Sequence, residues 1–299
     1  MKPFIKWVGG KTQILDKLLS EFPTEMNNYH EFCLGGGSVL FGLLQYINEN
    51  KIKLKGKIYA YDINEPLINV YKNIQNNYDE LYQCLTILIE EYKECPVNGE
   101  VIRKPRSTEE AFYCRENYYY YIRMLFNDLT KKDCAFGSAL FIFLNKTCFR
   151  GLYRMGPNGF NVPYGHYKNP EIVNAGHLQM VGTLIKDVEF RCCDFTESSQ
   201  YVKKGDFVYI DPPYAPETAN SFVNYTADGF GEEKHLALFQ LCSRFYEEGK
   251  HFLMSNADVE LVRQHFPDEK YNTQAILCKR SINAKNPDSK TFELLIKNY

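Results

Sequence analysis

Short apolar segments alternate with amphipathic segments along most of the chain, a pattern typical of α/β proteins. Apolar runs that end in turn residues predict strands, whereas apolar residues that repeat with helical spacing predict helices. The predicted strands are residues 29–33, 57–61, 207–210, 251–255 and 292–296. Helices are expected from about residue 38, from about residue 65 and over residues 232–248.

The middle of the chain has a different pattern. Residues 78–144 carry apolar positions at helical spacing, interrupted by a polar stretch at 96–107 that we expect to be a loop. Residues 146–170 are rich in glycine, asparagine, proline and aromatic residues. The pattern therefore predicts an α/β core with a helical insertion that ends in a loop-rich hairpin. The expected domains are residues 1–75 together with 175–299, and residues 76–174.

Composition and charge narrow the classes of protein. The 299 residues suffice for a sizeable core, and no apolar run reaches the roughly 18 residues of a membrane-spanning helix. Lys6 stands where a signal peptide would continue its apolar stretch, so we expect a cytoplasmic protein. Lysine and arginine total 35 against 37 aspartate and glutamate, and the net charge of −2 excludes a uniformly basic surface but not a local basic patch.

The ten cysteines and six histidines form no metal-binding motif. Neither a Cys-x-x-Cys nor a His-x-x-x-His spacing occurs, and zinc sites use spacings of this kind. We therefore expect reduced thiols and no bound metal.

A glycine-rich turn follows the first predicted strand. Residues 31–38 read EFCLGGGS, and glycines there let a ligand approach the backbone where the N–H groups of a helix start are free. Leu40 stands where a dinucleotide fingerprint needs glycine, which argues against a nicotinamide cofactor. Asp62 ends the next strand, where an acid either binds ribose hydroxyls or caps the following helix. Residues 10–12 resemble the end of a phosphate loop, but Ile5 replaces its required glycine, so we reject a nucleoside triphosphatase.

The most specific motif follows the predicted strand at 207–210. Asp211-Pro212-Pro213-Tyr214 joins a carboxylate to two prolines, which stiffen the turn and lack N–H groups. The proline carbonyls and the Asp211 side chain form fixed acceptors that can hold an exocyclic amino group, while the tyrosine ring can stack on its base. Such a sequence also ends strands for purely structural reasons, but its place after the other motifs favours catalysis.

In this order, the motifs resemble those of the Dam-type DNA adenine-N6 methyltransferases (D12 class, α group), over essentially the whole chain. Residues 6–11 look like the family's Lys-Trp-x-Gly-Gly-Lys, residues 31–38 its glycine loop and residues 145–170 its recognition hairpin. The glycine motif departs from the family's usual Glu-Pro-Phe beginning. The segments that are similar to the family's closing segment are Arg280-Ser281-Ile282 and Glu293-Leu294-Leu295.

The resemblance implies a Rossmann-like sheet that uses S-adenosylmethionine, with an inserted helical target-recognition domain and a β-hairpin. It also implies methylation of adenine N6 by base flipping within a short duplex sequence, for which GATC is expected. The implied catalytic residues are Asp211, Pro212, Pro213 and Tyr214, without a metal. The residues implied to bind the cofactor are Trp7, Lys11, Gly35, Gly37, Ser38, Asp62, Asp194, Phe195 and Asp211.

A basic and aromatic patch marks the expected DNA side. Residues 141–170 contain four basic side chains and no acidic one, with aromatic rings between them. Such a patch can pair with phosphates, read guanine edges and fill the gap left by a flipped base. The expected partners are double-stranded DNA and a cognate restriction endonuclease. By resemblance and charge, the expected DNA contacts are Lys6, Lys146, Phe149, Arg150, Arg154, Asn161 and Pro163.

Two alternatives remain open from the sequence. One is methylation of another amino group, namely cytosine N4, an RNA adenine or a protein glutamine; aspartate as the first residue of the tetrapeptide favours DNA adenine over these. The other is a DNA-binding protein with an inactive methyltransferase fold, against which the intact residues 211–214 argue.

Overall fold

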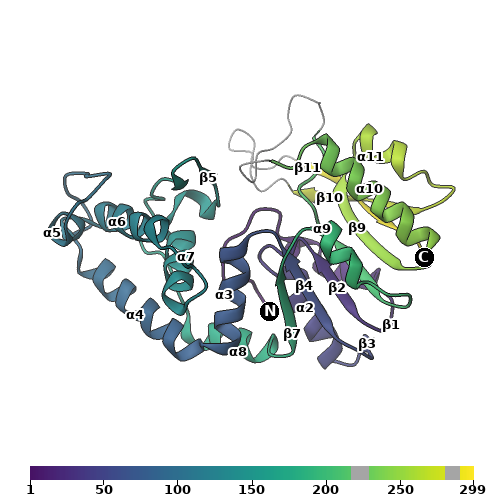
Figure 1. Ribbon diagram of the computed structural model, residues 1–299, viewed down its shortest axis with the longest axis horizontal. Helices are drawn as coiled ribbons and strands as arrows, with labels where there is room; N and C mark the ends of the chain where they lie inside the picture. The colour runs from purple at the N-terminus through teal and green to yellow at the C-terminus, as the bar shows by residue number, and fades with distance from the viewer. Residues whose placement is uncertain (217–228, 280–289) are drawn as a thin grey trace. The chain divides into compact units, whose positions relative to one another are not determined.

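The chain folds into two compact units in a computed structural model that describes residues 1–216, 229–279 and 290–299 (Figure 1). The sheet unit comprises residues 1–2, 9–63 and 187–299, and the helical unit comprises residues 3–8 and 64–186. These boundaries differ from the expected ones at 75 and 175. The matched segment 280–282 lies outside the described residues.

A seven-stranded, mostly parallel sheet forms the core of the sheet unit, counting the described residues (Figure 1). The five strands from β9 to β7 are parallel, whereas β11 runs antiparallel to both of its neighbours. The predicted strands and the predicted α/β class are confirmed, and β7 and β10 are additional. Across the sheet, the order is β10 (Asn272–Lys279), β11 (Lys290–Lys297), β9 (His251–Ala257), β8 (Phe207–Ile210), β2 (Tyr29–Phe32), β4 (Ile58–Asp62) and β7 (Val188–Cys192).

The strand order reverses between β2 and β8. The chain runs outward from β2 through β4 to β7, then returns to β8 on the other side of β2 and continues to β9. Phe32 of β2 lies opposite Ile210 of β8 in a parallel register. Ligands of open α/β sheets bind beyond the carboxyl ends of the strands at such a reversal. The glycine turn after β2 and the Asp211 corner after β8 therefore meet at the expected ligand position.

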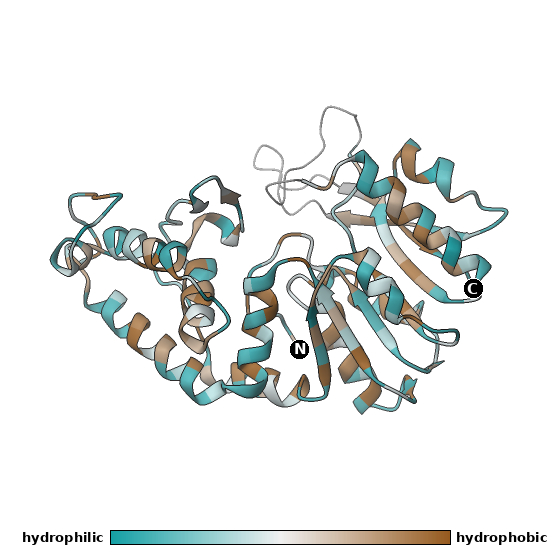
Figure 2. Cartoon of the chain, viewed as in Figure 1, coloured by the Kyte–Doolittle hydropathy of each residue, from teal (hydrophilic) through white to brown (hydrophobic). Residues whose placement is uncertain are grey.

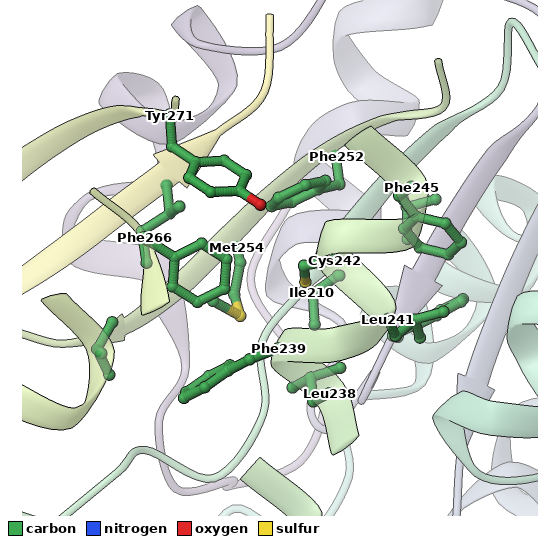
Figure 3. Close-up of a cluster of buried hydrophobic side chains, with 14 of the residues drawn as sticks. Ile210, Leu238, Phe239, Leu241, Cys242, Phe245, Phe252, Met254, Phe266 and Tyr271 are labelled. Atoms are coloured by element: carbon green, nitrogen blue, oxygen red, sulfur yellow. The ribbon is translucent and has the colours of Figure 1, made fainter. Parts of the chain in front are cut away.

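Helix α10 (Glu232–Glu247) is held on the sheet by an apolar cluster (Figure 3). Phe239 and Phe245 of α10 are buried in this cluster together with Phe252 and Met254 of β9. The other helices of the unit are α1 (Leu15–Ser20), α2 (Ser38–Asn48), α9 (Phe195–Ser198), α11 (Glu260–His265) and the 3₁₀ turns η1 (Lys11–Gln13) and η3 (Ser199–Tyr201). A separate two-stranded sheet pairs β1 (Glu25–Met26) with β3 (Lys53–Leu54).

The helical unit is built around α7 (Ala135–Thr147), whose side chains are almost all buried. Helix α4 (Tyr78–Glu94) alternates hydrophobic and hydrophilic residues, as an amphipathic helix with one solvated face does (Figure 2). No described helix has both the length and the apolarity that crossing a membrane requires. The remaining elements are α3 (Glu65–Asn76), α5 (Thr108–Phe112), α6 (Arg115–Asp128), α8 (Ala175–Leu184), η2 (Phe149–Gly151) and the hairpin strands β5 (Met155–Gly156) and β6 (Gly159–Phe160).

The polar stretch 96–107 contains neither helix nor strand, as predicted. A buried side chain on α6 holds it, because the Asn117 amide accepts a hydrogen bond from the Ile102 N–H at 2.8 Å and donates to the Glu100 carbonyl at 3.1 Å. The loop is therefore an ordered part of the helical unit.

Candidate active site and nucleic-acid interface

The glycine turn after β2 is held from two sides. Gly35 and Gly37 have φ values of 51° and 71°, in the left-handed region that favours glycine. The Asp62 carboxylate at the end of β4 accepts a hydrogen bond from the Gly35 N–H at 2.9 Å. The Ser38 hydroxyl at the start of α2 accepts one from the Lys11 N–H at 3.1 Å. Five of the implied cofactor residues, Lys11 included, are therefore connected around this turn.

The structure separates the two sequence interpretations of Asp62. The side chain that caps α3 is Asn64, which accepts a hydrogen bond from the Leu67 N–H at 3.0 Å. Asp62 instead lies against the glycine turn and is half-buried. Its implied contact with ribose hydroxyls stays a prediction.

Asp194 follows β7 and caps the short helix α9. Its carboxylate accepts hydrogen bonds from the N–H groups of Thr196 and Glu197, each at 2.9 Å. Burial acts to raise the pKa of Asp194, but these hydrogen bonds outweigh it and hold the pKa below the usual value. Phe195, the next residue, is half-buried, and its ring centroid lies 6.1 Å from that of Phe230.

The corner after β8 is fixed at three points. The Asp211 N–H donates to the carbonyl of the last residue of β2 at 3.3 Å. The Tyr214 hydroxyl donates to Glu293 of β11 at 2.7 Å, and the Ala215 N–H donates to the Asn256 side chain at the end of β9 at 3.0 Å. Pro212 is buried and Pro213 is half-buried. The acceptor groups of this corner are therefore held rigidly against three strands.

Within the described residues, the Asp211 carboxylate has one close cation. Lys11 Nζ lies 2.8 Å from Asp211 Oδ2, with only 4% of the Lys11 side chain and 19% of the Asp211 side chain exposed. Burial raises the pKa of Asp211 to about 6, with Lys11 lowering it and Glu293 raising it. Near neutral pH the group is therefore mainly a carboxylate and can accept hydrogen bonds. Burial and the nearby Asp211 raise the pKa of Tyr214 well above its usual value, so its ring stays neutral.

Lys6 is built into the helical unit. Its N–H donates to the Asn145 side chain at 2.9 Å, and the same amide donates back to the Lys6 carbonyl at 2.7 Å. Lys6 Nζ lies 3.6 Å from the centre of the Tyr167 ring and donates to the Lys146 carbonyl at 3.4 Å. A Cβ atom on Gly151 would lie 2.4 Å from the Lys6 Cβ, so glycine is required there.

Trp7 also belongs to the helical unit, unlike the other residues implied to bind the cofactor. Its ring stacks on Phe141 at 6.3 Å and on Tyr153 at 6.0 Å between centroids. These contacts hold Trp7 on α7 and on the segment that leads into the hairpin. Its proposed contact with the cofactor stays a prediction.

Arg154 is exposed at the base of the β5–β6 hairpin and is oriented by Asn161. Its Nε donates to Asn161 Oδ1 at 2.6 Å, and its Nη2 donates to the Asn161 carbonyl at 3.4 Å. This pairing leaves guanidinium donors to spare, because arginine has five N–H groups. Two of the expected DNA contacts therefore form one preorganised pair.

The other expected DNA contacts lie around η2. The Phe149 N–H donates to the Pro163 carbonyl at 2.8 Å, while the Phe149 ring is 44% exposed. Arg150 is exposed, has a φ of 56°, and carries its guanidinium 5.2 Å from the Phe149 ring centre. Burial and the nearby Lys6 lower the pKa of Lys146. The seven predicted DNA contacts thus share the helical unit.

The sequence interpretation gave no site role to three polar groups near the corner at residues 211–214, although two of them lie in the motifs that it quoted. Glu31 is 2% exposed, accepts a hydrogen bond from the Tyr29 hydroxyl at 2.7 Å, and has its pKa raised to about 8, mainly by burial. Glu293 and Asn256 hold the corner from the neighbouring strands. Glu31 begins the glycine motif, which is a usable signal, whereas Asn256 has no sequence signature.

In the part of the chain that the structure describes, no three histidine, cysteine, aspartate or glutamate side chains lie close enough together to form a metal site.

The sheet and its site define a class of protein. A Rossmann-like sheet carries a glycine turn beside an acidic strand end, and an Asp-Pro-Pro-Tyr corner lies across the strand reversal. This combination of fold and site is the one that the sequence resemblance implies for a methyltransferase.

Comparison with known proteins identifies the family. Residues 7–277 match the model of the D12 class N6 adenine-specific DNA methyltransferases. The chain is 38% identical over 311 residues to the Type II methyltransferase M.MjaIII of Methanocaldococcus jannaschii, covering 100% of this chain and 99% of that protein. It is 30% identical over 293 residues to the DNA adenine methylase of Haemophilus influenzae (97% and 90% covered) and 29% identical over 309 residues to the Type II methyltransferase M1.LlaDCHI of Lactococcus lactis (100% and 96% covered). The chain belongs to the D12 class of N6 adenine-specific DNA methyltransferases. Of the two sequence alternatives, the family excludes methylation of other amino groups.

Proposed function

We propose that this DNA adenine methyltransferase transfers the methyl group of S-adenosylmethionine to N6 of an adenine flipped out of a short duplex sequence, which we expect to be GATC. The observation that carries the proposal is the rigid corner at residues 211–214, whose acceptor carboxylate lies across the strand reversal from the glycine turn.

The order of the strand ends fits the shape of the cofactor. Asp194 follows β7, Asp62 ends β4, the glycine turn follows β2 and Asp211 follows β8, and these four strands are adjacent in this order. Neighbouring strands lie about 4.8 Å apart, so the four positions span roughly 14 Å. A line of acid, acid, glycine turn and acid can hold adenine, ribose hydroxyls and the methionine chain in turn. The fit of the residues supports S-adenosylmethionine, whose sulfonium supplies an electrophilic methyl group when bound.

The corner residues have separate tasks in the reaction. Asp211 and the Pro212 carbonyl accept hydrogen bonds from the adenine amino group, which increases the electron density available on nitrogen. The Tyr214 ring stacks on the base, and its hydroxyl is anchored on Glu293 so that the ring is already oriented. The gain in rate comes from positioning and from fixed dipoles, because the groups need little reorganisation.

The helical unit supplies the DNA-reading residues in this proposal. Lys6 and Arg154 are both held by side-chain or ring contacts, so their donors are preorganised to contact guanine edges. The exposed Phe149 ring is suited to fill the gap left by a flipped base, and Lys146 and Arg150 to pair with phosphates. Two relatives are named Type II methyltransferases, which supports a cognate restriction endonuclease as a partner.

Sequencing of modified bases tests the proposal. DNA from methylation-deficient cells that express the protein is expected to carry N6-methyladenine in one short sequence, and in GATC if the family expectation holds. Expression of the Asp211→Ala variant supplies the matched control. Modification of cytosine, or of adenine without a sequence context, would contradict the proposal.

A further inference from the structure

The Lys11 side chain forms an ion pair with Asp211, the carboxylate of the proposed catalytic corner at residues 211–214. Lys11 Nζ lies 2.8 Å from Asp211 Oδ2, donates to the Gly9 carbonyl at 2.7 Å, and lies 4.9 Å from the centre of the Tyr214 ring. The sequence resemblance places Lys11 at the methionine part of the cofactor, so this pairing was not expected.

Asp211 and Tyr214 are the groups that the proposed function gives to adenine. In that proposal, the Asp211 carboxylate accepts a hydrogen bond from the adenine amino group and the Tyr214 ring stacks on the base. An ammonium group offers three N–H donors and no acceptor, and it is attracted to the face of an aromatic ring. Lys11 thus meets the same two groups with the same donor chemistry.

We infer that Lys11 is a positioning residue for methyl transfer: its ammonium keeps the Asp211 carboxylate ionised and aligned, and yields one of its contacts to the target base when the base enters. This inference rests on the proposed function. It gives Lys11 a role at the acceptor carboxylate in addition to the contact with the cofactor that the resemblance implies.

The charges around Asp211 show why a cation is needed there. Among the described residues that shift the pKa of Asp211, Glu293 of β11 raises it and Lys11 is the one cation that lowers it. On β2, Glu31 faces Asp211 with its own pKa raised to about 8, mainly by burial. The other described titratable groups that face Asp211 are Tyr29 and Cys33 from β2 and its end, Tyr209 from β8, and Tyr214. Without Lys11, burial and these neighbours would hold Asp211 protonated close to neutral pH.

The position of Lys11 is built into the fold. Its side chain is 4% exposed, and its backbone N–H is bound to the Ser38 hydroxyl, which begins α2 directly after the glycine turn. The ammonium is therefore presented from the glycine turn to the catalytic corner as part of a buried network. A surface lysine would have no such constraint.

The pH profile of methyl transfer tests this inference. The profile of kcat/KM reports the pKa values of the free enzyme, so the wild type is expected to lose activity as the pH falls through about 6. Lys11→Met removes the cation. The pH at which its kcat/KM falls on the acid side (the acid limb of the profile) is therefore expected to rise by at least about one unit. For a shift of one pH unit, its loss of activity at pH 6.5 is then about threefold larger than its loss at pH 8.5, and a larger shift widens this difference. Lys11→Arg keeps a cation and is expected to keep the wild-type limb.

A second variant and a binding measurement keep the test decisive. Lys11→Gln retains a hydrogen-bond donor without charge and must shift the limb as Lys11→Met does, which covers a failure of the methionine variant to fold. Lys17→Met, at an exposed lysine of α1, is the matched control with an unchanged profile. Calorimetry with S-adenosylmethionine measures the cofactor affinity of each Lys11 variant, so that the pH profiles are compared at saturating cofactor.

Two results would overturn the inference. One is an equal loss of activity at every pH, and the other is a loss explained by weaker cofactor binding. A wild-type enzyme that leaves adenine unmodified would instead contradict the proposed function, and that outcome is visible before any Lys11 variant is compared.

Discussion

Asp62 shows how one acidic side chain can support a site through the backbone. It binds the Gly35 N–H, and it lies in line with Asp194 and Asp211 across the sheet. Hydrogen bonds to charged groups contribute about 1.5–3 kcal/mol. We expect Asp62→Ala to raise the dissociation constant for S-adenosylmethionine by about tenfold or more, measured by calorimetry.

The neighbouring Asn64 provides a matched control, because it caps α3. Asn64→Ala is expected to lower the free energy of unfolding by about 1 kcal/mol while leaving the cofactor affinity unchanged. An unaltered dissociation constant in Asp62→Ala would show that Asp62 does not act on the cofactor.

Arg154 carries the prediction for target recognition. Because its guanidinium is oriented by Asn161, we expect it to make a bidentate contact with guanine. Arg154→Ala is expected to reduce the ratio of methylation rates on cognate and single-mismatch duplexes by about tenfold, with little change in cofactor affinity. Lys93→Ala, at an exposed position on α4, is the control. An unchanged ratio in Arg154→Ala would remove this residue from recognition.

At the level of residues, the sequence indicates which residues belong to the site better than it indicates which side chains contact one another. The Asp-Pro-Pro-Tyr motif and the glycine turn could be located because few residue types fit those chemical and backbone requirements. The pairing of Lys11 with Asp211, and the role of Asn256, could not be located. They depend on which side chains the sheet register brings together across large sequence separations, and no local pattern encodes that.

At the level of elements, the burial of each strand largely determined whether it could be predicted from the sequence. Strands β2 and β8 are buried along their whole length, and β8 reads as an apolar run before a proline turn. Strand β2 also buries His30 and Glu31, so it is marked mainly by the glycine turn that follows it. Strand β10 begins with Asn272-Thr273-Gln274 at the edge of the sheet, where polar residues are tolerated, so its sequence gives little signal. Strand β7 has an alternating pattern of burial that could have been recognised. Strands of two residues, such as β5, are too short for any periodicity.

Helix α10 allows a test of how the sheet unit is stabilised. Phe239 is 3% exposed within the apolar cluster that joins α10 to the sheet (Figure 3). Phe239→Ala is expected to lower the free energy of unfolding by about 3–5 kcal/mol, because it removes buried surface and leaves a cavity. Urea unfolding measures the change. Glu247→Ala on the exposed face of the same helix is expected to change it by less than about 0.5 kcal/mol, and similar values for both variants would contradict the packing argument.

At the level of the whole molecule, the prediction of a core with a helical insertion did not include the N-terminal segment. Residues 3–8 belong to the helical unit although residues 9–63 belong to the sheet unit. Phe4 packs edge-on against Tyr71 of α3 at 5.4 Å, and Trp7 stacks on Phe141 of α7. The motif at 6–11 is continuous in sequence, so its division between two units could not be recognised from the pattern. One motif thereby contributes Lys6 to the expected DNA side and Lys11 to the catalytic corner.

The most direct measurement is methyl transfer from tritiated S-adenosylmethionine to duplex DNA by purified wild type and Asp211→Ala, with thermal unfolding of both recorded in parallel. The wild type is expected to form N6-methyladenine, and a folded Asp211→Ala variant is expected to be slower by about a hundredfold or more, because a fixed acceptor at the reacting nitrogen is lost. A variant that still methylates adenine at nearly the wild-type rate would contradict the assignment of the catalytic corner.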